Sequence, residues 1–117
     1  MSIAQLVMPS LVPNLYVESE EYRTRCSELI ERGVGGFCVF QGELGQTGQI
    51  LAELQAQADE PLLFSADYEH GLPMRLEGGT DFPHAMALAM SGDISLTKNV
   101  AGAIARECAA LGVHWNF

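Results

Sequence analysis

The sequence predicts an α/β fold in which parallel strands alternate with helices. Residues 34–40 and 61–67 are short apolar runs without polar alternation, which is typical of strands covered on both faces. Segments with apolar residues at helical spacing lie between and after these runs. The chain has 117 residues, of which 48% are hydrophobic and 18% charged, so it has material for one compact domain with a single core.

Each expected element is bounded by a residue that ends or caps it. Pro9 and Pro13 limit the first strand, and Gly33 and Gly112 follow two of the helices, where a left-handed residue is favoured. Glu20 and Glu21 suit the first turn of the first helix. The expected elements are a strand at 5–8, a helix at 19–32, a strand at 34–40, a helix at 47–58, a strand at 61–67, a helix at 96–111 and a strand at 113–117.

A polar, glycine-rich segment follows residue 67 and contains Pro73 and Pro83. We expect a loop of about 25 residues here, and loops of that length in compact domains are usually functional. The last strand has no helix after it, whereas a complete barrel of eight βα units takes about 250 residues. The chain is therefore expected to be either a small open sheet or the first half of a larger barrel.

Composition excludes several classes of protein. The formal net charge of −9, with six scattered basic residues, makes nucleic acid an unsuitable partner. No run approaches the ~18 uncharged residues of a membrane span, and the first residues lack the basic and apolar regions of a secretory signal. We expect no membrane partner and a cytoplasmic location.

Cys26, Cys38, Cys108 and Trp115 lie inside expected regular elements. We interpret the three cysteines as small buried hydrophobic residues without a disulfide or thiolate role. Trp115 is expected to be a buried strand aromatic, although a sugar-stacking platform is the alternative.

Asp67 is the candidate binding residue, because it lies where an apolar strand gives way to the long loop. Ligands bind at the carboxyl ends of strands in parallel α/β folds. An ionised carboxylate can accept hydrogen bonds at both oxygens, which suits the two donors of a vicinal diol on a sugar. The alternative is that Asp67 is a structural cap of the loop.

Glu69 could in principle form a catalytic pair with Asp67. Side chains two residues apart on an extended segment lie on one side, about 6.5 to 7 Å apart. A catalytic pair of carboxylates must instead flank the bond that it cleaves from opposite sides. We therefore expect no catalytic residue here, and we interpret Glu69 as a structural acceptor inside the loop, with Arg75 as its candidate donor.

The acidic residues of the loop do not form a metal motif with its histidines. The spacing of Asp67, Glu69, His70, His84 and His114 matches no known set of ligands. We expect neither a metal nor a cofactor.

Five segments in order carry a resemblance to a known family: AQLVMP, GVGGFCVF, PLLFSADYEHGLPMRL, GGTDFPHAMALA and AGAIARECAALGVHWNF. Together they resemble the amino-terminal catalytic domain of glycoside hydrolase family 3, the β-glucosidases and β-N-acetylglucosaminidases. The most specific part is the D-x-E-G-G-x-V-x-R-L type motif, matched at Asp67, Glu69, Gly71, Arg75 and Leu76. The chain departs from it in having His70 for the first glycine and Pro73 for the valine.

The resemblance implies the first half of a TIM-type (β/α)8 barrel, with residues 1–117 covering about four βα units and ending around the fourth strand. It implies that Asp67 binds sugar hydroxyls in the −1 subsite of a retaining β-glycosidase, with Glu69, His70 and Arg75 supporting the loop. Both catalytic groups lie downstream of the matched region in the family.

The implied partners are a carbohydrate substrate and the remaining half of the barrel, or a second copy of the chain. By itself the chain is expected to be inactive. The alternative from another class is a small α/β carbohydrate-binding module without catalysis.

Overall fold

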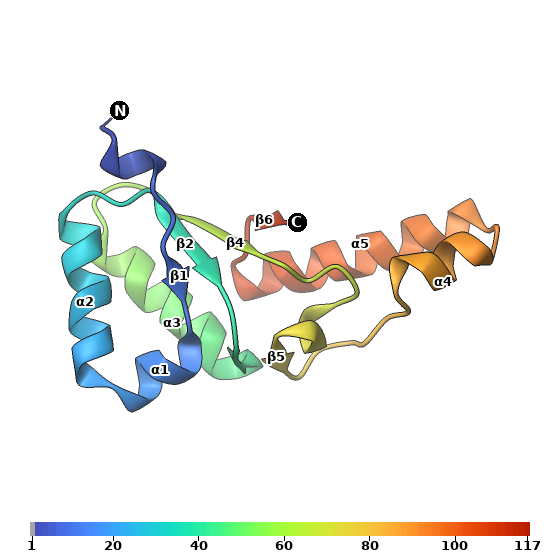
Figure 1. Ribbon diagram of the computed structural model, residues 1–117, viewed down its shortest axis with the longest axis horizontal. Coiled ribbons are helices and arrows are strands. Elements are labelled where there is room, and N and C mark those ends of the chain that lie inside the picture. The colour runs from blue at the N-terminus through green and yellow to red at the C-terminus, as the bar shows by residue number, and fades with distance from the viewer. Residues whose placement is uncertain (1) are drawn as a thin grey trace.

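The computed structural model describes residues 2–117 and shows a mixed α/β protein with two parallel sheets. The main sheet has four strands in the order β1-β2-β4-β6 (Figure 1). Their bounds are Ser10–Leu11, Gly36–Val39, Leu63–Ala66 and Trp115–Asn116. A second sheet pairs β3 (Gly42–Glu43) with β5 (Leu76–Glu77). The predicted α/β class with parallel strands is confirmed.

The helices connect the strands of the main sheet and pack beside one another. α1 (Pro13–Glu18) and α2 (Glu20–Glu31) lie between β1 and β2, α3 (Leu44–Gln57) follows β3, and α5 (Ile94–Leu111) leads into β6. α2 contacts α3 and α3 contacts α5, so the helices follow the order of the strands. A doubly wound sheet would reverse its strand order at a switch point. Strands added in one direction, each with its helix, agree with part of a TIM-type barrel.

Local hydrogen bonds determine where three helices begin. The side chains of Ser19, Glu43 and Asp93 accept hydrogen bonds from backbone N–H groups in the first turns of α2, α3 and α5. For Glu43 the donors are Gly45 and Gln46, and these two bonds lower the pKa of its carboxyl group. This cap starts α3 three residues before the predicted residue 47, because the apolar spacing alone does not show a cap. Gly112 ends α5 in the left-handed conformation, as predicted.

The core lies between the main sheet and the helices. Leu11, Val39 and Ala66 share one register across β1, β2 and β4, and none of them is more than 1% exposed. The neighbouring register holds Ser10, Cys38, Ser65 and Trp115, of which Ser10 and Trp115 are exposed. Because successive side chains point to opposite faces, the sheet has one face that is buried across β1, β2 and β4 and one more open, more polar face.

The predicted strand at residues 5–8 is wrong. Ala4–Leu6 forms a turn of 3-10 helix (η1), and β1 lies further along at Ser10–Leu11. Strand pairing decides this position, because Cys38 N–H donates to the carbonyl of Pro9 and Phe40 N–H donates to that of Leu11. Sequence reasoning also missed α1, since Pro13 begins that helix instead of only ending a strand.

The long segment after residue 67 was predicted to lack regular structure, and this is wrong too. It contains a 3-10 turn η2 (Leu72–Met74), strand β5 and a short helix α4 (Ala85–Met90). Each of these elements is six residues or shorter, so none produces a clear periodic pattern.

The chain is extended and open at the β6 edge. Its radius of gyration is 15.5 Å, whereas a compact domain of this length has about 13 Å. α4 and the first half of α5 project from the rest of the chain (Figure 1). Trp115 is 58% exposed, so its predicted burial is wrong, because no strand within residues 2–117 pairs with the outer edge of β6. None of the helices in this range combines the length and apolarity needed to cross a membrane.

We expect purified residues 1–117 to self-associate at tens of micromolar, because an unpaired edge strand with exposed Trp115 and Phe117 is a template for pairing. Light scattering coupled to size exclusion should show dimers or larger species. Trp115→Lys should shift the chain toward monomer, whereas Val17→Lys, at an exposed position on α1, should not. A monodisperse wild-type monomer would contradict this expectation.

Candidate functional site

Asp67 and Arg75 form an ion pair at the carboxyl edge of the main sheet. Asp67 directly follows β4, a central strand that pairs with β2 on one side and β6 on the other. Nη2 of Arg75 donates to Oδ2 of Asp67 at 2.7 Å, and the two side chains are 27% and 32% exposed, respectively. Oδ1 of Asp67 accepts no hydrogen bond from any group in residues 2–117, so it remains an acceptor for a ligand.

The chain returns Arg75 to Asp67 through the turn η2. Leu72 at the start of η2 is buried, and the carbonyl of Arg75 accepts from Gly42 N–H at 3.3 Å, where β3 meets β5. The guanidinium group also lies 5.8 Å from the centre of the Phe40 ring. Backbone pairing and packing therefore hold the arginine from two sides.

Glu69 does not pair with Arg75, which corrects the predicted donor. The side chain of Glu69 is exposed, and no hydrogen bond to it is found in the described part of the chain. The reason is the η2 turn, which brings Arg75 back to the end of β4 and not to the loop beyond it.

His70 lies against the later part of the same loop. Its ring centre is 4.2 Å from that of His84, and its Nδ1 is 3.4 Å from Oδ1 of Asp81. The carbonyl of His70 accepts from Phe82 N–H at 2.9 Å. Both side chain and backbone of His70 thus connect the first part of the loop to residues 81–84.

Gly71 allows the close approach of these two parts. It has φ +112°, and a Cβ atom there would lie 2.3 Å from the carbonyl oxygen of Thr80. Glu107 of α5 holds Thr80 in turn, because its carboxylate accepts from both the N–H and the hydroxyl of Thr80. Glycine at this motif position is therefore required by packing as well as by its backbone conformation.

Sequence reasoning missed Asn116 in β6. Its Oδ1 accepts from Tyr68 N–H at 2.7 Å, and its Nδ2 donates to the carbonyl of Tyr68 at 3.1 Å. One feature of the sequence could have indicated it: Asn116 is an amide residue at the end of the last expected strand, and this strand lies beside β4. Tyr68 itself is fully buried, which raises the pKa of its hydroxyl group far above the usual value.

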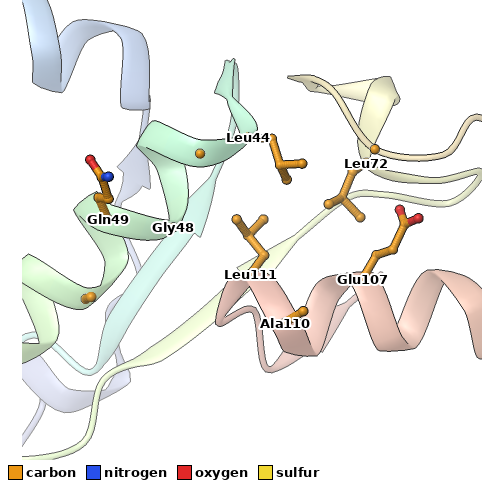
Figure 2. Close-up of a pocket in the computed structure, with 10 residues that line it drawn as sticks. Leu44, Gly48, Gln49, Leu72, Glu107, Ala110 and Leu111 are labelled. Atoms are coloured by element: carbon orange, nitrogen blue, oxygen red, sulfur yellow. The ribbon is translucent and has the colours of Figure 1, made fainter.

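A cavity of about 590 Å³ lies between α3, α5 and the η2 turn (Figure 2). Its wall is mainly apolar, with Leu44, Leu72 and Leu111 pointing into it. Glu107 at its rim is already bonded to Thr80. Neither Asp67 nor Arg75 lines this cavity. The charged candidate site is therefore separate from the apolar cavity.

The remaining candidate groups within residues 2–117 are potential metal ligands and cysteines. No three His, Cys, Asp or Glu side chains in this range converge as ligands for a metal ion. Cys26 and Cys108 are buried, as predicted, and burial raises the pKa of both thiols. Cys38 is only partly buried.

A sheet that grows in sequence order, with an ion pair at the carboxyl ends of its strands, is the arrangement expected for part of a barrel-type α/β protein. Residues 1–117 match the model of the glycosyl hydrolase family 3 N terminal domain. The chain belongs to this family, which confirms the resemblance carried by the motif around Asp67.

The chain is also similar to a beta-N-acetylglucosaminidase/beta-glucosidase from Cellulomonas fimi. The two are 33% identical over 84 residues, which cover 72% of this chain and 15% of that protein. The chain thus spans a small part of the length of this relative, and the family relation supports glycoside hydrolysis at the level of the family.

Gly71→Ala should destabilise the protein more than Gly33→Ala does. Both positions have positive φ, but no atom lies within 4 Å of a Cβ built at Gly33, whereas Thr80 lies in the way at Gly71. We expect about 1 to 3 kcal/mol for the positive φ at either site and a further 1 to 3 kcal/mol from the overlap at Gly71. Urea unfolding of the two variants measures the difference, and equal losses would contradict the close packing of Gly71.

Proposed function

We propose that this chain is part of a retaining β-glycosidase and that Asp67 binds sugar hydroxyls in the −1 subsite. The observation that carries the proposal is the state of the Asp67 carboxylate. Arg75 holds Oδ2, while Oδ1 accepts no hydrogen bond within residues 2–117 and lies at the carboxyl edge of the sheet. Family membership supports the reaction class.

The pair suits recognition of a sugar. The Arg75 contact orients the carboxylate and supplies a positive charge beside it, and the free oxygen accepts from a hydroxyl donor. A hydrogen bond from a neutral hydroxyl to a charged group contributes about 1.5–3 kcal/mol, more than one between neutral groups. Such a contact orients the pyranose ring against the catalytic groups.

The substrate class we propose is a β-glucoside or a β-N-acetylglucosaminide, the two activities in the name of the Cellulomonas fimi relative. Retention requires two catalytic groups on opposite sides of the glycosidic bond. Asp67 and Glu69 lie two residues apart on the same stretch of chain and cannot flank a bond from opposite sides, so neither is assigned to catalysis. The nucleophile and the acid/base group therefore come from other parts of the protein, and residues 1–117 alone bind without turnover.

Asp67→Asn in the full-length enzyme should lower kcat/KM at least about tenfold, because the amide keeps the size and one acceptor but loses the charge. Asp67→Ala should lower it further. Steady-state kinetics with aryl β-glucoside and aryl β-N-acetylglucosaminide measure the loss. Asp59→Asn neutralises an exposed carboxylate before β4, at the opposite edge of the sheet, and serves as the control.

The competing role for Asp67 is a structural cap of the loop. In that case Asp67→Asn would unfold the protein, while any folded Asp67→Ala variant would bind sugar normally. Circular dichroism and thermal unfolding of each variant separate this outcome from a loss of binding.

His70→Gly restores the family motif and should change the preference between the two substrates. The side chain of His70 packs on His84 beside the loop that carries Asp67, so its removal changes the shape of the wall near the site. The ratio of kcat/KM for the glucoside to that for the N-acetylglucosaminide should shift several-fold. An unchanged ratio would show that His70 does not contribute to the sugar preference.

A further inference from the structure

Asn116 makes two hydrogen bonds to a single residue in the loop that bears the proposed sugar acceptor. Oδ1 accepts from Tyr68 N–H at 2.7 Å, and Nδ2 donates to the carbonyl of Tyr68 at 3.1 Å. One amide side chain therefore bonds to both backbone polar groups of the residue after Asp67, and the carbonyl of Tyr68 also accepts from Gly71 N–H at 3.1 Å. Buried backbone groups need such partners, and Tyr68 is 0% exposed.

These bonds begin where the sheet ladder stops. The register of β4 with β6 ends at Ala66 opposite Asn116, and Phe117 N–H donates to the carbonyl of Ala66 at 3.0 Å. Beyond Ala66 the backbone of β6 no longer serves as partner. The Asn116 side chain replaces it and extends the pairing past Asp67 to Tyr68.

Asp67 is thereby fixed on both sides by the same neighbouring strand. The carbonyl before it is held by Phe117, and the N–H and carbonyl after it are held by Asn116. Two anchored neighbours leave the backbone of Asp67 little freedom to rotate, and this sets the direction in which its side chain leaves the sheet. Arg75 then holds the carboxylate itself.

We infer that Asn116 is a positioning residue for Asp67: it aligns the sugar-binding carboxylate through the backbone of Tyr68 and does not contact the sugar. The inference rests on the proposed role of Asp67. A misplacement of about 1 Å in a binding group can cost on the order of a hundredfold in rate. Asn116→Ala in the full-length enzyme should therefore lower kcat/KM at least about tenfold.

His114, the residue before β6, provides a matched control. Its Nδ1 accepts from Phe64 N–H at 3.1 Å, so it too joins a side chain from this segment to the β4 backbone, but three residues before Asp67. His114→Ala should lower the midpoint of thermal unfolding about as much as Asn116→Ala does. It should leave kcat/KM within about twofold of wild type, because the backbone beside Asp67 stays anchored.

A double-mutant cycle with Asp67→Asn separates positioning from general stability. If Asn116 acts through Asp67, adding Asn116→Ala to Asp67→Asn should cost less than about twofold more in kcat/KM. Asn116→Asp keeps the acceptor for Tyr68 N–H and loses the donor to the carbonyl. Its kcat/KM should therefore lie between the value of the wild type and that of Asn116→Ala. It also serves as the test variant if the alanine variant does not fold.

Three results would overturn the inference, and they are distinguishable. If Asp67→Asn lowers kcat/KM but the Asn116 variant behaves like His114→Ala, or if the two losses multiply, Asn116 has no positioning role and the proposed function of Asp67 stands. If Asp67→Asn leaves kcat/KM unchanged, the proposed function of Asp67 fails, and the role of Asn116 fails with it.

Discussion

The pairing of β4 between β2 and β6 is the constraint on which the site depends. A parallel strand held on both sides has a defined end, and Asp67 is the first residue beyond that end. Two further contacts hold the residues at this end. The turn η2 brings Arg75 to the Asp67 carboxylate, and Asn116 accepts from the backbone N–H of Tyr68, the next residue. Without the central strand, none of these partners would meet Asp67.

The loop after β4 is stabilised by pairwise contacts between its parts and with α5. Gly71 lies against Thr80, His70 lies against His84, and Glu107 bonds to Thr80. These contacts explain how a polar segment with little apolar material can hold one conformation. They also connect the site to α5, the helix that leads directly into β6, so the same βα unit supports the loop and supplies Asn116.

Strong hydrophobic patterns in the sequence predicted the fold class. They did not predict which residues far apart in the sequence pair with each other. The apolar runs containing Phe37 and Phe64 gave the two central strands, because burial on both faces excludes polar residues. β1 was misplaced because its position depends on contacts with β2 and not on its own composition. The same division holds at the site. Asp67 could be predicted as a candidate from its place at the end of a strand. That Arg75 pairs with Asp67 and not with Glu69 could not, because the turn that joins these residues brings together positions 8 apart. The support from Asn116 depends on a contact with Tyr68, 48 positions away.

The open face of the sheet is compatible with the proposed role of the chain, which is binding without catalysis. Leu11 and Phe37 are buried under the helices, whereas Ser10 and Trp115 on the other face of the sheet remain exposed. In a closed barrel that second face is covered by the remaining strands, and ligands lie over the carboxyl ends of the whole ring. Groups that must flank a glycosidic bond from opposite sides come most naturally from opposite sides of that ring. A sheet of four strands can place Asp67 on one side of a ligand, and under the proposed function the groups on the other side would come from further strands of a barrel.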